Sequence, residues 1–124
     1  MRTSAIVLLA TLAAATAAAP ASSAAPSSRS ALPVVNVVAT GEQKFMPDHV
    51  VLHVGKRQTL RFTSTGGVHG VASKELGIPA TTIAAGQPVS VVITPKKAGT
   101  YKVQCTIVCG PGHADMLLTI EVKP

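Results

Sequence analysis

The sequence contains few aromatic residues and few acids. Among its 124 residues there is no Trp, one Tyr and two Phe, and only five side chains are Asp or Glu. A core must therefore be built mainly from Val, Leu and Ile. Scarce aromatics and scattered lysines also argue against a nucleic-acid-binding protein. The carboxylates are dispersed, so no pair suited to acid–base catalysis stands out. We predict no catalytic residues, and a carrier rather than an enzyme.

Cysteine is nearly absent, and no apolar run is long. Two cysteines are too few for a disulfide framework, an iron–sulfur cluster or a four-cysteine zinc site. The longest apolar run, 5–19, has 15 residues, whereas a membrane span needs about 20. Its basic start and small-residue flanks are typical of a secretory signal peptide.

These features predict three segments along the chain. We expect a signal peptide over residues 1–24, cut between 17 and 25, and an Ala/Ser/Pro-rich linker over 25–33. One domain over 34–124 follows. The protein is predicted to be exported, either periplasmic or secreted. An uncleaved leader would instead tether it to a membrane.

The predicted domain alternates apolar and polar residues with a period of two, which indicates β-strands. The clearest run is "MLLTIEV", with four apolar residues on one face, and "HVVLHV" shows the same pattern. Glycine- and proline-containing turns separate these runs. Six to eight short strands predict an all-β, single-domain Greek-key β-sandwich or barrel with antiparallel pairing. Residues 71–85 are predicted to form an irregular connection.

Four potential metal ligands lie within the twelve-residue stretch "CTIVCGPGHADM". They are Cys105, Cys109, His113 and Met116. Thiolate, imidazole and thioether donors together favour copper in an electron-transfer site, with Met as a weak axial ligand. Structural zinc sites need four strong ligands, and calcium and magnesium need oxygens. The stretch therefore predicts a copper site in a loop between two strands.

A complete site needs a second imidazole from elsewhere in the chain. His69 is the leading candidate, because it follows Gly66 and Gly67 and lies 36 residues before Cys105. His49 and His53 compete with it. They are roughly 13 Å apart along one strand at about 3.3 Å per residue, so they cannot bind one metal together. Both are expected to be exposed strand residues.

Several stretches resemble a known family. "FMPDHVVLHVGKRQTLRF", "VHGV", "AGTYKVQC" and the cysteine loop are similar to a cupredoxin of the CuA type. This is the binuclear copper A domain of cytochrome c oxidase subunit II and nitrous oxide reductase. The resemblance covers residues 45–124. It implies two copper ions bridged by two thiolates, with one imidazole on each ion and two weak ligands. The implied metal ligands are His69, Cys105, the backbone carbonyl of Ile107, Cys109, His113 and Met116.

The chain departs from the family at one position of the motif. Ile107 stands where the family has Glu, so the backbone carbonyl is kept and the carboxylate is lost. The chain also has no Trp to receive electrons, and it carries a net charge of +6. The resemblance therefore implies the copper domain rather than a complete oxidase subunit. The expected partners are redox proteins, such as a cytochrome or an acidic partner; nucleic acid is not expected.

Three alternatives stay open at this point. Cys105 and Cys109 could form a disulfide in an exported protein. A mononuclear blue-copper site could use His69, Cys109, His113 and Met116, with one copper and Cys105 as a bystander. The protein could also store or deliver copper rather than carry electrons. The absence of Met/His-rich arms favours the carrier.

Overall fold

The computed structural model describes residues 13–20 and 31–124. Residues 13–20 are exposed and have no regular secondary structure. The remainder of the predicted signal peptide and most of the predicted linker lie outside the described residues. Within the described residues, no helix is both long enough and apolar enough to cross a membrane.

The domain is almost entirely β-structure, as the sequence pattern predicted. One short 3-10 helix, η1, interrupts the connection before the last strand. The strands are β1 (Val34–Ala39), β2 (Phe45–Met46), β3 (His49–His53), β4 (Gln58–Ser64), β5 (Val68–Ser73), β6 (Ile78–Ala84), β7 (Val89–Ile93), β8 (Gly99–Gln104) and β9 (Leu117–Lys123), and η1 spans His113–Asp115.

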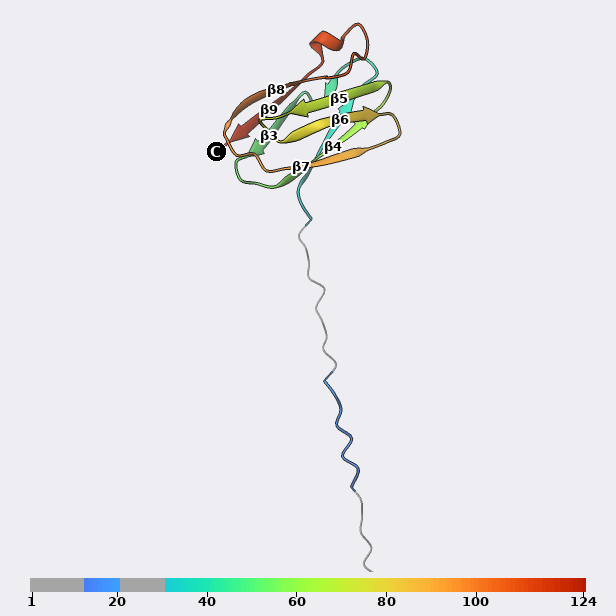
Figure 1. Ribbon diagram of the computed structural model, residues 1–124, viewed down its shortest axis with the longest axis vertical. Coiled ribbons are helices and arrows are strands. Elements are labelled where there is room, and N and C mark those ends of the chain that lie inside the picture. Colours follow the sequence, from blue (N-terminus) through green and yellow to red (C-terminus); the bar gives the residue numbers. More distant parts are fainter. Residues whose placement is uncertain (1–12, 21–30) are drawn as a thin grey trace, which may run out of the picture.

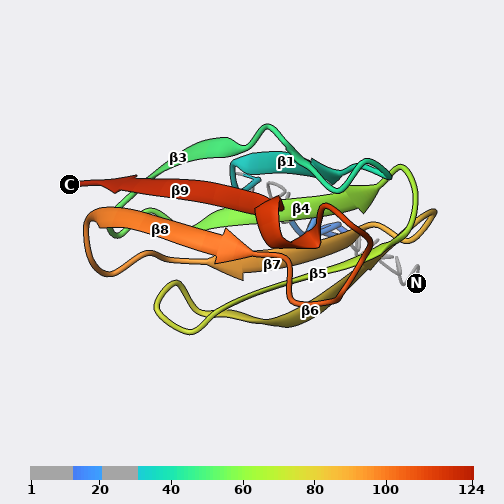
Figure 2. The ribbon, with the colours of Figure 1, turned by 90° about the horizontal axis from the view of Figure 1, so that it is seen from above.

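The strands form a sandwich closed on one side by a hairpin (Figures 1 and 2). One sheet has the order β2-β1-β4-β7, and the facing sheet has the order β3-β9-β8. The hairpin β5–β6 forms the third, two-stranded sheet. Two pairs are parallel, β1 with β4 and β3 with β9. The prediction of antiparallel pairing does not hold for these two pairs, whose strands are joined through longer crossovers.

The core follows the period-two pattern of the sequence. On β9, Leu118, Ile120 and Val122 are buried while the residues between them reach the surface. On β4, Leu60 and Phe62 are fully buried. Because successive side chains of a strand point to opposite faces, one face of each strand supplies the core. The core is mainly aliphatic, as the scarcity of aromatics required, and its other buried side chains include two Phe rings and, near the β8–β9 loop, Cys105, Met116 and His69.

The predicted irregular connection over 71–85 is wrong. Residues 68–84 instead form two antiparallel strands with a bulge between Val71 and Ser73. Alternation is hard to see here, because Gly70, Ala72, Pro79 and Ala80 replace the usual β-branched residues. Pairing to a neighbouring strand and burial of Val71 and Ile83 decide the conformation.

Candidate metal centre

The loop between β8 and β9, residues 105–116, carries most of the predicted donors, and β5 carries the other. The two ends of the loop are hydrogen-bonded to each other, since the backbone N–H of Cys105 donates to the carbonyl of Met116 at 3.0 Å. Cys105 continues the buried face of β8, and Met116 precedes the buried face of β9. The sheet register thus sets both ends of the loop. Figure 2 shows the loop with its 3-10 turn between these strands.

The two cysteines are free thiols that face each other. Their sulfur atoms are 3.6 Å apart, whereas a disulfide bond is about 2 Å long. Cys105 is buried and Cys109 is partly buried. Burial, together with the hydrogen bond to Cys105, raises the pKa of the Cys109 thiol. The arrangement is therefore a pair of thiols held close together and not a disulfide.

His69 on β5 lies beside these thiols and has one ring nitrogen without a partner. Its ring is completely buried, and its Nε2 lies 2.8 Å from the carbonyl of Gly66. A carbonyl only accepts, so Nε2 carries the proton and Nδ1 keeps a lone pair. Nδ1 is buried with no hydrogen-bond partner. One ligand atom each from His69, Cys105 and Cys109 lie within 4.8 Å of one another.

The remaining predicted donors surround Cys109 and Cys105. Nδ1 of His113, on η1, lies 3.8 Å from Cys109 Sγ, and Sδ of Met116 lies 3.6 Å from the same sulfur. The carbonyl of Ile107 accepts from the Cys105 thiol at 3.2 Å, so it points into the cluster. The structure thus brings all six predicted groups to one place. His113 touches the cluster on the Cys109 side and lies outside the tight group formed by His69 and the two thiols.

Two glycines allow the ligand loop to approach its neighbours closely. A Cβ on Gly70 would overlap Thr106 Oγ1 and lie 3.0 Å from Ile107 Cγ1. Gly70 is also bonded to the loop, because its carbonyl accepts from Thr106 N–H at 3.0 Å. β5 and the loop are therefore in backbone contact, which places His69 beside Cys105. The sequence suggested glycine as a turn former near His69 but did not show this contact.

Gln43, in the turn between β1 and β2, supports the loop from the other side. Its Oε1 accepts from the N–H of Gly112 at 3.2 Å, and its Nε2 donates to the carbonyl of Gly41. A Cβ on Gly110 would lie 2.9 Å from Gln43 Cδ, so the side chain fills the space that two glycines leave. Gln43 also has a φ of 57°, in the left-handed region. Sequence reasoning missed this residue, which lies 69 positions from Gly112.

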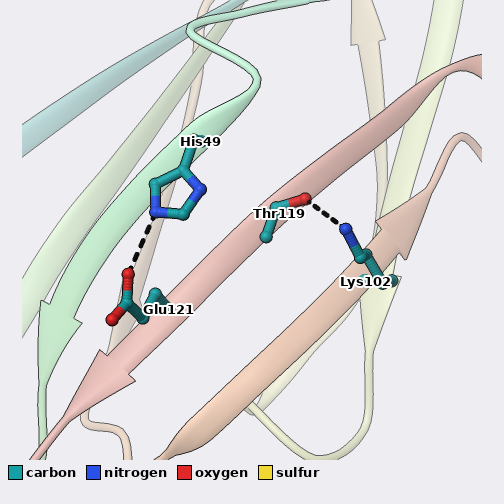
Figure 3. A network of polar contacts seen from close by, with 4 residues as sticks. All are labelled: His49, Lys102, Thr119 and Glu121. Carbon is teal, nitrogen blue, oxygen red and sulfur yellow. Dashed lines mark hydrogen bonds and ion pairs between the residues drawn. The ribbon is translucent and has the colours of Figure 1, made fainter.

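The competing histidines lie elsewhere. His49 is on the outer face of the β3-β9-β8 sheet, where its Nε2 is 3.1 Å from Glu121 Oε2 (Figure 3). His53 is exposed at the other end of the same strand. Neither belongs to the cluster, as expected. Asp115, between two donor positions, is exposed.

Comparison with known proteins identifies the family. Residues 4–114 match the family described as cupredoxin-like domain. The chain belongs to this family. No curated protein matches it. The cupredoxin fold is a copper-binding, electron-transfer fold, so the resemblance seen in the sequence is confirmed at this level.

Solved structures of similar shape include oxidase subunits and blue copper proteins. The periplasmic domain of cytochrome oxidase subunit II (CoxB) of Bradyrhizobium japonicum has a TM-score of 0.65 and 16% identity, covering 73% of this chain and 83% of its own. A chain of a heme-copper terminal oxidase dimer has a TM-score of 0.62 and 24% identity, and the match covers 73% of this chain and 65% of that one. Auracyanin A, a "blue" copper protein of Chloroflexus aurantiacus, has a TM-score of 0.56 and 19% identity, and the match covers 75% of this chain and 100% of auracyanin A. At these identities the similarity establishes the fold alone.

The donor set of this cupredoxin fits copper. A buried imidazole nitrogen without a partner, two adjacent thiols and a thioether form one cluster. An unpaired buried polar atom costs about 1–3 kcal/mol, which a bound ion would offset. Thiolate, imidazole and thioether ligands together favour copper, whereas a structural zinc site uses four strong ligands. The hydrogen bond from His69 Nε2 to the Gly66 carbonyl is the kind of contact that fixes a metal-binding ring.

Proposed function

We propose that this cupredoxin is an exported electron-transfer protein with a binuclear, CuA-type copper centre. Cys105 and Cys109 would share both ions, His69 and His113 would each bind one, and Met116 and the Ile107 carbonyl would be weak ligands. Bound copper would supply a reversible one-electron couple. The protein would supply a fixed ligand set, so that gain or loss of the electron requires little rearrangement.

The position of Cys105 is the observation that carries the binuclear reading. Its sulfur is buried, faces Cys109 at 3.6 Å and belongs to the same tight group as the His69 nitrogen. In a mononuclear site built on Cys109, this second thiol would have no role. A blue-copper site remains the alternative, because His69, Cys109, His113 and Met116 form a complete set for it.

The electron would pass through the surface over the ligand loop. Val108, between the two cysteines, is 81% exposed, and Pro111 is also exposed. A partner that packs on these apolar residues would lie directly over the donors and exclude water from the contact. We infer that the partner is another redox protein, such as a cytochrome or an oxidase component. Export rests on the predicted signal peptide alone.

Copper binding to the full chain tests the proposal. Reduced, metal-free protein is titrated with copper, and the bound metal is measured after removal of the excess. Two copper ions per chain and a purple colour are expected. One ion and a blue colour would support the mononuclear alternative. A protein that takes up copper but releases it rapidly to a chelator, without reversible redox cycling, would instead be a storage or delivery protein.

A further inference from the structure

The positive charge of the domain lies at the end opposite the metal donors. Four segments meet there: the β3–β4, β5–β6 and β7–β8 turns and the end of β9 (Figures 1 and 2). In these segments Glu75 is the one acidic side chain. Six exposed cationic residues, called the basic pole below, lie in them: Lys56, Arg57, Lys74, Lys96, Lys97 and Lys123.

Hydrogen bonds join these segments into one surface. The N–H of Val54 donates to the carbonyl of Lys123 at 2.9 Å, and the N–H of Gly55 donates to the carbonyl of Pro95 at 2.8 Å. Lys74 and Lys96 line one shallow cavity. Within residues 13–20 and 31–124, the one ion pair is His49–Glu121, on a sheet face (Figure 3). None of the six cations of the basic pole forms an ion pair within these residues, and Glu75, which lines the same cavity as Lys74 and Lys96, is the one carboxylate side chain in the four segments.

The metal end has the opposite charge balance. Its exposed charged residues are Glu42, Lys44, Asp48 and Asp115, so acids outnumber bases there. β9 links the two ends, running from beside Met116 to Lys123, which is roughly 20 Å at about 3.3 Å per residue. An electron-transfer partner bound at the basic pole would thus be separated from the donors by the length of the domain.

The N-terminal part of the chain joins the domain at the same pole. Val34, the first residue of β1, pairs with Thr59 near the start of β4, and the Thr59 N–H donates to the carbonyl of Pro33 at 2.9 Å. The apolar run over residues 5–19 is connected to the domain through this point. The basic pole is therefore the end nearest to where the predicted leader attaches.

We propose that the basic pole docks on an anionic phospholipid surface and directs the metal end away from it. Clustered lysines and arginines are attracted to anionic lipid when they lie within about a Debye length, roughly 8–10 Å, of the headgroups. Six exposed cations on neighbouring turns can approach a flat surface together. An acidic redox protein fits less well, because it would bind far from the copper ligands.

Vesicle binding by the full chain tests this proposal independently of copper. Partition is measured onto phosphatidylcholine vesicles with and without phosphatidylglycerol, and the ratio of the two coefficients removes any contribution from the apolar 5–19 run. The test variant is K96Q/K97Q. The matched control, K44Q/R61Q, removes the same charge from exposed positions outside the pole. Circular dichroism confirms that both variants are folded.

For the wild type, the partition coefficient with phosphatidylglycerol divided by that without it should exceed one, and this ratio should fall as salt is added. The pole variant should lower it about 25-fold at low ionic strength, since each cation contributes about fivefold. The control should change it by less than about twofold. Equal losses in the two variants, or no preference for phosphatidylglycerol, would overturn the proposal. If the pole variant instead loses binding only to poly-glutamate, the pole recognises an acidic polypeptide and the lipid proposal is wrong.

Discussion

One ring nitrogen, Nδ1 of His69, is the strongest residue-level argument for a metal ligand in the cluster. It is buried with no partner, although Gly66 fixes the rest of the ring. Burying an unsatisfied nitrogen in a core is unfavourable, so such an atom needs a partner, and a bound ion beside the two thiols would supply one. The thiols of Cys105 and Cys109 complete the same group.

Replacing Cys105 by Ser distinguishes a binuclear from a mononuclear copper site. Ser preserves the size of the side chain but removes the thiolate, which the binuclear site needs and the mononuclear site does not. The C105S protein should bind at most one copper ion, and its purple absorption should be lost. Metal analysis and visible spectra give the result. A spectrum identical to that of the wild type would favour the blue-copper site.

Gln43 should act on the ligand loop without binding metal. The Q43A change removes the acceptor for Gly112 N–H and opens space beside Gly110. Loss of one such hydrogen bond costs about 0.5–1.5 kcal/mol, and the cavity adds to this. We expect a lower free energy of unfolding and faster loss of copper to a chelator.

The control for this change is Gln87, which is exposed in the turn between β6 and β7. Q87A should leave the free energy of unfolding within about 0.5 kcal/mol of the wild type, the usual range for a surface substitution. The rate of copper loss to the chelator should not change. If Q43A and Q87A behave alike, Gln43 does not support the loop.

The pH dependence of the copper-free protein reports on Cys109. Burial raises the pKa of this thiol, so the folded chain keeps the proton at pH values where the unfolded chain has lost it. The free energy of unfolding therefore falls as pH rises above the ordinary thiol pKa of about 8.5, until the raised pKa is passed. Denaturation under reducing conditions should show a steeper fall for the wild type than for C109S. Parallel curves would contradict the raised pKa.

At the level of strands, the contact between β5 and the ligand loop depends on Gly70. G70A would force a Cβ against Thr106 and Ile107. Overpacking of this kind costs about 1–3 kcal/mol, and here it would also move His69 away from the thiols. We expect lower stability and weaker copper binding, measured by denaturation and by chelator competition.

Two further variants make the Gly70 test specific. G41A is the matched control, since its Cβ would meet ordinary contacts of 3.7 Å or more. The double change G70A/T106A removes the overlapping hydroxyl and should recover part of the loss. No recovery would indicate that Gly70 acts through backbone flexibility instead.

The sequence predicted those strands whose apolar residues alternate, and it predicted which loop carries the donors. Met116, Leu118, Ile120 and Val122 are buried as the period of two required. The β5–β6 hairpin was not predicted, because small residues and Pro79 interrupt the alternation of apolar and polar side chains there. Support by Gln43 could not be predicted either, because it depends on how two distant turns meet. Local spacing predicted the thiols, whereas the tertiary fold placed His69 beside them.

At the scale of the whole molecule, the surface over the metal donors and the basic pole lie at opposite ends. The donors and the exposed Val108 occupy one end, and the basic pole occupies the other. The net charge of +6 therefore says little about the surface that a redox partner meets. A partner chosen by contacts over the ligand loop can bind while the opposite end faces lipid.

The electron paramagnetic resonance spectrum of the copper-loaded, oxidised protein is the sharpest test of the proposed binuclear copper centre. Two thiolates shared between two ions would spread one unpaired electron over both nuclei. A binuclear centre should give a hyperfine pattern from two equivalent copper nuclei, together with two copper ions per chain. A pattern from a single copper nucleus, with one ion per chain, would contradict it.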